Sequence, residues 1–255
     1  MDIIGAIILA IIQGITEFLP VSSTGHMILA AALLEIAQTD FVKSYELALQ
    51  FGSILAVVFS YWRRFLDWNI LKRIIVAFVP TAIIGFVLYR IYKGVLLGNS
   101  QVVLWALLLG GVFLVLFELF YREKSSFDDI SRIPYKHCLL IGLLQCISII
   151  PGTSRSAPTI ICGLALGMKR KTVVLFSFLL AVPTMIVASG FDLVNSAGEF
   201  SSGQVGMLLT GFVISFLVAL VAIKLFLGYV GKRNFIPFAV YRIFLVVLFY
   251  FFVMQ

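Results

Sequence analysis

The sequence predicts an all-α polytopic membrane protein, with six transmembrane helices and two re-entrant helical hairpins in an inverted-topology repeat. Composition is the first observation behind this prediction. Hydrophobic residues make up 62% and charged residues 12% of the 255 positions, and the mean hydropathy is +1.11, whereas soluble domains contain about 25% charged residues. The second observation is the clustering of basic residues in loops, and the third is a pair of polar motifs inside apolar sequence.

Six segments are long and apolar enough to cross about 30 Å of hydrocarbon, for which about 20 residues suffice. The expected crossings run from Glu46 to Trp62, Ile74 to Tyr89, Val102 to Phe120, Val173 to Gly190, Val205 to Leu227 and Ile236 to Val253. Shorter apolar stretches, interrupted by Pro or Gly, flank the two polar motifs; they cover residues 3–18, 27–36, 138–150 and 158–168. We expect these stretches to form the two re-entrant hairpins, with one motif at each tip.

Basic residues indicate the orientation, because cytoplasmic loops of membrane proteins carry an excess of Lys and Arg. One set of loops holds Arg63, Arg64, Lys72, Arg73, Arg122, Lys124, Arg132, Lys136, Lys169, Arg170, Lys171, Lys232 and Arg233, and the opposite set only Lys43, Arg90 and Lys93. We therefore expect both termini on the outer side. The net charge of +7 then reflects membrane orientation, and we expect no nucleic-acid partner.

The two halves of the chain resemble each other, over about residues 1–121 and 136–255 of a single integral membrane domain spanning 1–255. Pro20-Val-Ser-Ser matches Pro151-Gly-Thr-Ser, and Phe51-Gly-Ser-Ile-Leu-Ala-Val matches Phe176-Ser-Phe-Leu-Leu-Ala-Val at nearly the same separation. Each half has an odd number of expected crossings, so the second copy would enter from the opposite face, and the broken helices would meet near the bilayer middle. Chance similarity between apolar helices is the alternative.

The first polar motif supplies a carboxylate. Glu17 is the only acid expected inside the membrane, since Glu118 is close enough to the Arg122 loop to reach water. Gln13 precedes Glu17 by one helical turn and projects from the same face. A carboxylate in this position can hold a divalent cation or take a proton from a nucleophile. A purely structural Glu17, satisfied by amides at a helix end, is the alternative.

The same motif supplies hydroxyls and an imidazole. Ser22, Ser23 and Thr24 follow Pro20, where hydroxyls commonly cap helices, and we expect at least one of them to do so. We also expect Ser22 and Thr24 to bind the diphosphate. Ser23, with Glu17 as its base and His26 three positions later, also has the components of an activated nucleophile. His26 would protonate the leaving oxygen or steady the phosphate. A water nucleophile is the alternative to Ser23.

The second polar motif, residues 151–156, places an arginine in the membrane interior, where ionisable groups usually mark function. Arg155 has a guanidinium that matches phosphate oxygens and keeps its charge. Ser154 and Ser156 flank it, and Thr159 follows one helical turn later. The Pro-Gly turn would aim amides of a new helix N-terminus at an anion. An ion pair with the N-terminal carboxylate that only locks the hairpins together is the alternative.

The two motifs resemble the signatures of the undecaprenyl-diphosphate phosphatase family linked to bacitracin resistance. The resemblance rests on Gln13-Gly-Ile-Thr-Glu17-Phe-Leu-Pro-Val-Ser-Ser23-Thr-Gly-His26, Tyr61-Trp-Arg-Arg64, Pro151-Gly-Thr-Ser-Arg155-Ser and Phe176-Ser-Phe-Leu-Leu-Ala-Val-Pro183. It therefore covers most of the chain. Where many members have Gly-Ala after the arginine motif, this sequence has Ala157-Pro158, which removes one backbone donor; a proline is tolerated in a first helical turn.

This resemblance implies a multi-pass enzyme of the bacterial cytoplasmic membrane that removes the terminal phosphate of a polyprenyl (C55) diphosphate, to regenerate the lipid carrier for peptidoglycan. It implies a dependence on Mg²⁺ or Ca²⁺, with Glu17 as the metal ligand. It carries the site onto Gln13, Glu17, Ser23, His26, Ser154, Arg155, Ser156 and Thr159. Besides the lipid diphosphate and membrane lipids, a second copy in a homodimer is an expected partner.

A transporter or flippase for anionic lipids is the rival interpretation, because broken helices in inverted repeats are typical of transporters. One distance tests the split site directly. If Glu17 and Arg155 lie within about 10 Å of each other, a single diphosphate can bridge them through two contacts near 3 Å each.

Overall fold

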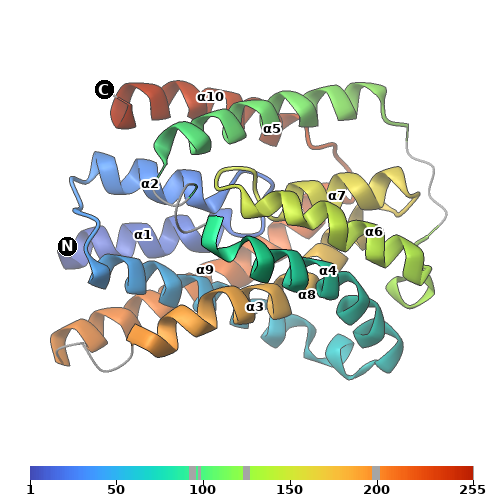
Figure 1. The fold of residues 1–255 in the computed structure, drawn as a ribbon, viewed down its shortest axis with the longest axis horizontal. Coiled ribbons are helices and arrows are strands. Elements are labelled where there is room, and N and C mark those ends of the chain that lie inside the picture. Colours follow the sequence, from blue (N-terminus) through green and yellow to red (C-terminus); the bar gives the residue numbers. More distant parts are fainter. Residues whose placement is uncertain (92–95, 97–98, 123–126, 197–201, 255) are drawn as a thin grey trace.

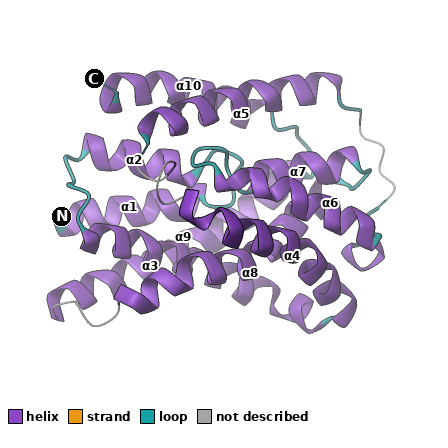
Figure 2. Cartoon of the chain, viewed as in Figure 1, coloured by secondary structure: helices purple, strands orange, loops and turns teal. Residues whose placement is uncertain are grey.

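Helices make up the fold, as predicted. A computed structural model of the protein describes residues 1–91, 96, 99–122, 127–196 and 202–254. Across these residues the only β-structure is an isolated bridge between Phe127 and Met168 (Figure 2).

Six long helices are apolar enough, by length and composition, to cross a membrane. They are α3 (Asp40–Leu66), α4 (Trp68–Ile91), α5 (Ser100–Phe120), α8 (Arg170–Ser196), α9 (Ser202–Val230) and α10 (Ile236–Val253). Each of the six predicted crossings falls within one of these helices, although several helices begin earlier than hydropathy indicated. In α3 the side chain of Thr39 caps the helix by accepting from the Val42 N–H, so its charged first turn is helical although it is not apolar.

Four short helices, joined in two pairs, flank the predicted motifs. They are α1 (Ile3–Thr16), α2 (Ser23–Leu33), α6 (Tyr135–Gln145), continued by the 3₁₀ turn η3 (Cys146–Ile149), and α7 (Ser156–Ala165); a second 3₁₀ turn, η2 (Ile130–Arg132), precedes α6. At about 1.5 Å per residue, helices of 10 to 14 residues extend only about 15–21 Å, less than a bilayer core of about 30 Å. The turns within the two pairs lie side by side near the centre of the molecule (Figure 1).

Helices from the two halves of the chain pack against each other rather than forming separate bundles. Helix α3 contacts α8 and α9, α5 contacts α10, α1 contacts α9, and α4 contacts both α6 and α8. Glycines permit close backbone approach at these crossings, as is common between membrane helices. A Cβ on Gly52 of α3 would lie 2.4 Å from the Phe212 carbonyl oxygen of α9, and one on Gly142 of α6 would lie 2.0 Å from the Ala77 carbonyl oxygen of α4.

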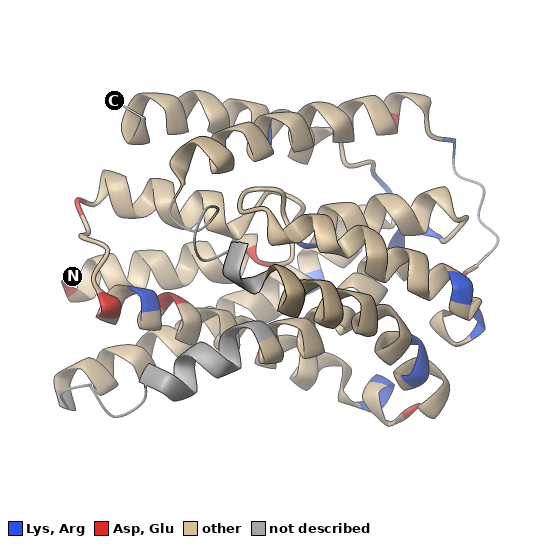
Figure 3. Cartoon of the chain, in the orientation of Figure 1, with Lys and Arg blue, Asp and Glu red and all other residues tan. Residues whose placement is uncertain are grey.

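Basic residues gather at one end of the molecule. Most of the Lys and Arg residues drawn lie at the end opposite both termini (Figure 3), which agrees with the predicted sorting of basic loops. Lys93 and Lys124 from that prediction fall outside the described residues, as does the side chain of Arg90.

The expectation that Glu118 reaches water was wrong. Its carboxylate is buried, pairs with the guanidinium of Arg170 and accepts a hydrogen bond of 3.1 Å from the Phe235 backbone N–H. This acid therefore joins α5, α8 and the start of α10, because α8 brings a basic residue within reach that hydropathy alone does not place.

Candidate active site

The carboxylate of Glu17 receives donors from both polar motifs. Glu17 follows the last residue of α1, and its side chain is 4% exposed. Its Oε2 accepts from Gln13 Nε2 at 2.7 Å and from Ser23 Oγ at 2.9 Å, while Arg155 Nη2 donates to Oε1 at 3.3 Å. These side chains satisfy the carboxylate, so the alternative in which helix-end amides satisfy it is not supported.

The distance between the two functional groups meets the condition set by the sequence. Glu17 and Arg155 are in direct contact, well inside the span of a diphosphate. Arg155 Nη1 also donates to the Ser177 carbonyl of α8 at 3.2 Å. Its Nε, however, is buried and has no hydrogen-bond partner among the residues that the structure describes, and the same holds for Ser177 Oγ. Buried polar atoms are usually satisfied, so this guanidinium retains donor capacity for a further ligand.

The backbone of both loops adopts a strained conformation before each new helix begins. Ser22 has a φ of 69° and Ser154 a φ of 73°, in the left-handed region where non-glycine residues are uncommon and which is often found at functional sites. Ser22 caps α2 by accepting from the Gly25 N–H at 3.3 Å, which confirms the expected capping role. Gly152, with a φ of 95°, lets the second loop pass close to α5, where a Cβ would lie 2.6 Å from the Val103 carbonyl oxygen.

The hydroxyls of the arginine motif connect the two loops. Ser154 Oγ lies 3.1 Å from Ser156 Oγ, and Ser156 Oγ donates to the Leu19 carbonyl of the first loop at 3.2 Å. Helix α7 begins at Ser156, which confirms the predicted helix start beside Arg155. The first amides of any helix lack intrahelical partners, so the α7 amides are available to an anion there, except at Pro158.

Ser22, whose side chain caps α2, does not contact Glu17 or the Arg155 guanidinium directly, and neither do Thr24, Thr159 and His26. Thr24 is exposed, and no hydrogen bond involves its side chain in the described part of the chain. Thr159 Oγ1 donates to the Arg155 carbonyl at 3.1 Å and to Gln145 Oε1 at 3.4 Å, so it links α7 to the end of α6. His26 Nδ1 donates to the Ser22 carbonyl at 2.8 Å, and its Nε2 lies 2.8 Å from the Tyr241 hydroxyl.

Sequence reasoning missed Arg242, which holds both loops together. Its side chain is fully buried in α10. Nη1 donates to the carbonyls of Pro20 at 3.4 Å and Thr153 at 3.0 Å; Nη2 donates to those of Gly152 at 3.1 Å and Ala106 at 3.0 Å. No carboxylate among the described residues pairs with this guanidinium. A lone arginine in an apolar span was the available signal, but backbone carbonyls leave no trace in a sequence.

Oxygen atoms suitable for a hard cation come from the first polar motif. The Glu17 carboxylate, the Ser23 hydroxyl and the Gln13 amide oxygen come from the first loop and the end of α1. Within the described ranges, no three His, Cys, Asp or Glu side chains are grouped as a metal site. A single carboxylate that shares a cation with substrate phosphates is a common arrangement for Mg²⁺, and this donor set fits it.

Comparison with known proteins identifies the family. Residues 6–248 match the family described as bacitracin resistance protein BacA. The chain belongs to the BacA family. It is therefore a multi-pass membrane protein, and both loops, together with Tyr241 and Arg242, lie within the matched region.

Relatives of this BacA-family chain include proteins named undecaprenyl-diphosphatase. It is 50% identical over 256 residues to the undecaprenyl-diphosphatase of Persephonella marina, covering 100% of both chains. It is 48% identical over 251 residues to that of a Sulfurihydrogenibium species, covering 98% of this chain and 99% of the relative. It is 47% identical over 239 residues to that of Aquifex aeolicus, covering 93% of each.

We predict that Arg242→Met destabilises this BacA-family protein by at least about 2 kcal/mol, because hydrogen bonds to a charged group contribute about 1.5–3 kcal/mol each and part of that gain is offset by relief of a buried charge. Arg242→Lys should lie between wild type and Arg242→Met. Denaturation of the purified protein in detergent measures the effect. Arg233→Met, at an exposed position, is the control. Equal stabilities of the two methionine variants would contradict the stabilising role of Arg242 between the two loops.

Proposed function

We propose that the chain is an undecaprenyl-diphosphatase, which hydrolyses the terminal phosphate of a polyprenyl (C55) diphosphate to give the lipid monophosphate used in envelope synthesis. The observation that carries this proposal is the contact of Ser23 Oγ and Arg155 Nη2 with the two oxygens of Glu17. The proposed nucleophile (Ser23), its base (Glu17) and a guanidinium that can bind phosphate (Arg155) therefore lie in one cluster. The names of the relatives and the family match point to the same activity.

The same proposal places the cluster at the middle of the bilayer of the bacterial cytoplasmic membrane, at the tips of two re-entrant hairpins in an inverted repeat. The order of two short and three long helices occurs twice along the chain. If α1 corresponds to α6 and α4 to α9, the contact of α1 with α9 becomes the contact of α6 with α4, and both occur. The pairs α3 with α8 and α5 with α10 map onto themselves, as a twofold relation between the repeats requires.

The hydrolysis begins when the diphosphate binds Arg155, which exchanges its contact with Glu17 for phosphate oxygens. Glu17 is then free to accept the proton of Ser23 as Oγ attacks the terminal phosphorus. The bond from that phosphorus to the bridging oxygen breaks, and the lipid monophosphate leaves with the bonding electrons. Glu17 passes its proton to the departing lipid monophosphate. Water then attacks the phosphorus of the phosphoserine, and Glu17 accepts the proton of this water. Glu17 returns that proton to Ser23 Oγ as the bond from this oxygen to phosphorus breaks and inorganic phosphate leaves. Positioning and charge neutralisation supply most of the rate in such transfers.

His26 has a positioning role in this scheme. Its Nδ1 donates a hydrogen bond to the carbonyl of Ser22, the residue before the proposed nucleophile, and so restrains the backbone there. Its Nε2 is hydrogen-bonded to the Tyr241 hydroxyl. Protonation of the leaving oxygen by His26 stays a prediction, since Nε2 must first release the tyrosine hydroxyl. Ser154, Ser156 and the first amides of α7 would bind phosphate oxygens beside Arg155.

A divalent cation, Mg²⁺ or Ca²⁺, would be held by Glu17 with the Gln13 amide oxygen and the phosphates. When bound it neutralises part of the negative charge on the diphosphate. The long prenyl chain would extend along apolar helix surfaces, where each buried methylene contributes about 0.8 kcal/mol.

We predict that Glu17→Gln and Arg155→Lys each lower phosphate release from a prenyl diphosphate by at least about 100-fold, because removal of one group that stabilises the transition state typically has this effect. The assay is run in detergent, where a transporter has no gradient to use and releases no phosphate. Lys43→Gln, which removes half of an exposed pair, is the control. Wild-type rates in a folded Arg155→Lys protein would contradict the assignment.

Ser23→Ala separates the two nucleophiles. With serine as the nucleophile, this variant should lose at least about 1,000-fold in rate, since loss of a catalytic nucleophile commonly costs more than this, and acid quenching of the wild-type reaction should trap phosphate on Ser23. An alanine variant that keeps more than about a tenth of the rate, together with no trapped phosphate, would assign the attack to water held by Glu17.

We predict that chelation of divalent cations reduces turnover to background and that Mg²⁺ restores it. Gln13→Glu should lower the Mg²⁺ concentration for half-maximal activity by about tenfold, because added ligand charge raises the affinity for a hard cation. Gln101→Glu, at an exposed site outside the cluster, is the control. Full activity in the presence of chelator would remove the cation from this proposal.

A further inference from the structure

We propose that the face formed by α1, α9 and α10 binds one anionic phospholipid, with an acyl chain in an apolar groove and the phosphate at the basic end of that groove. This site is separate from the diphosphate cluster and does not depend on the proposed function. Three observations carry it: the composition of the groove, the cations at one of its ends, and its length.

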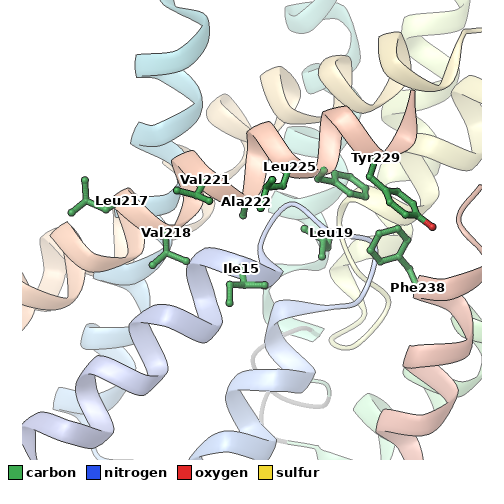
Figure 4. A pocket seen from close by; sticks show the side chains of 10 residues that line it. Ile15, Leu19, Leu217, Val218, Val221, Ala222, Leu225, Tyr229 and Phe238 are labelled. Carbon is green, nitrogen blue, oxygen red and sulfur yellow. The ribbon is translucent and has the colours of Figure 1, made fainter. Parts of the chain in front are cut away.

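The groove is apolar and open on the outer surface of the helix bundle. It has a volume of about 630 Å³, and its lining includes Leu217, Val221 and Leu225 of α9, Ile15 and Leu19 from the region of the first loop, and Phe238 of α10 (Figure 4). Leu217, Val221 and Leu225 are each more than half exposed. Such a surface in a membrane protein is covered by hydrocarbon rather than by water.

Basic side chains lie at one end of this groove. Tyr229 lines both the groove and an adjoining polar pocket, which is formed with Lys232, Arg233 and Asn234. No salt bridge involves Lys232 or Arg233 among the described residues. Lys224 is also exposed on α9, and its long side chain can extend along the helix toward the same end. An apolar groove that ends beside basic side chains is complementary to a lipid with a negatively charged headgroup.

The length of the groove selects a phospholipid over a C55 prenyl lipid. At about 1.5 Å per residue, Leu217 and Tyr229 lie about 18 Å apart along α9. One leaflet contributes half of a hydrocarbon core of about 30 Å, so a single acyl chain fills the groove while its headgroup stays at the membrane surface. A chain of eleven isoprene units is much longer than this groove.

Occupancy of the groove reaches the first polar loop through Leu19. The Leu19 side chain lines the groove, and its carbonyl accepts from Ser156 Oγ of the second loop. A lipid chain that packs on Leu19 therefore supports the junction between the two loops from the outside.

Native mass spectrometry of the detergent-solubilised full chain tests this proposal with phosphatidylglycerol and phosphatidylcholine of identical acyl chains. Phosphatidylglycerol should bind at least about tenfold more tightly, because each basic residue near an anionic headgroup adds to the attraction. Lys232→Gln combined with Arg233→Gln should reduce this preference to below about threefold. Lys72→Gln combined with Lys136→Gln removes the same charge from other exposed positions and should leave the preference intact.

Two tryptophan variants test the groove itself. Val221→Trp fills the groove and should weaken phosphatidylglycerol binding, whereas Val213→Trp, on an exposed part of α9 that does not line it, should have no effect. Equal binding of the two lipids by the wild-type protein, or equal effects of the two charge-removing pairs, would overturn the proposal. Displacement of phosphatidylglycerol by undecaprenyl phosphate would also overturn it, by assigning the groove to the long prenyl lipid.

Discussion

An ionisable side chain in an apolar interior must find a partner, and the contact between Glu17 and Arg155 is how this protein meets that constraint. Removing a carboxylate or a guanidinium from water costs several kcal/mol, and mutual attraction repays this only with good geometry and further hydrogen bonds. Here Gln13 and Ser23 supply those bonds to Glu17, but Arg155 Nε receives none from the described part of the chain. The pair is thus only partly satisfied, and a diphosphate with several charged oxygens is a better partner for the guanidinium than one carboxylate oxygen at 3.3 Å.

This contact exists because two chain segments far apart in sequence end their short helices at the same place. Helix α1 ends at Thr16, and α6 with its 3₁₀ extension ends at Ile149. Each is followed by a loop that carries polar side chains. Arg242 binds the carbonyls of both loops, and Ser156 adds a direct bond between them. The position of Ser23 relative to Arg155 therefore depends on α10, whose Tyr241 also contacts His26 of α2.

The long helices and the contact between Glu17 and Arg155 could be predicted from the sequence. The residues that hold the two loops and the helices in place were harder to predict. The six long helices follow from hydropathy, and Glu17 and Arg155 were identified because charges are rare in such segments. Arg242 escaped because its partners are main-chain carbonyls, which every residue possesses. The contact of His26 with Tyr241 spans 215 positions, and Glu118 was misplaced because its partner, Arg170, lies on a helix whose packing no local pattern encodes. Thr24 belongs to the motif by spacing, but the first turn of α2 directs it away from the cluster.

The most direct test is the distance from the Arg155 guanidinium nitrogens to phosphorus, measured by solid-state NMR with ¹⁵N-labelled arginine and a bound, non-hydrolysable prenyl diphosphonate. Hydrogen bonds of about 2.7–3.2 Å between guanidinium and phosphate require a nitrogen-to-phosphorus distance below about 5 Å, and the account predicts this value for Arg155, identified by its absence in Arg155→Lys. Bound diphosphonate with no phosphorus within that distance of Arg155 would show that the Glu17–Arg155 pair only joins the two loops, and would contradict the account.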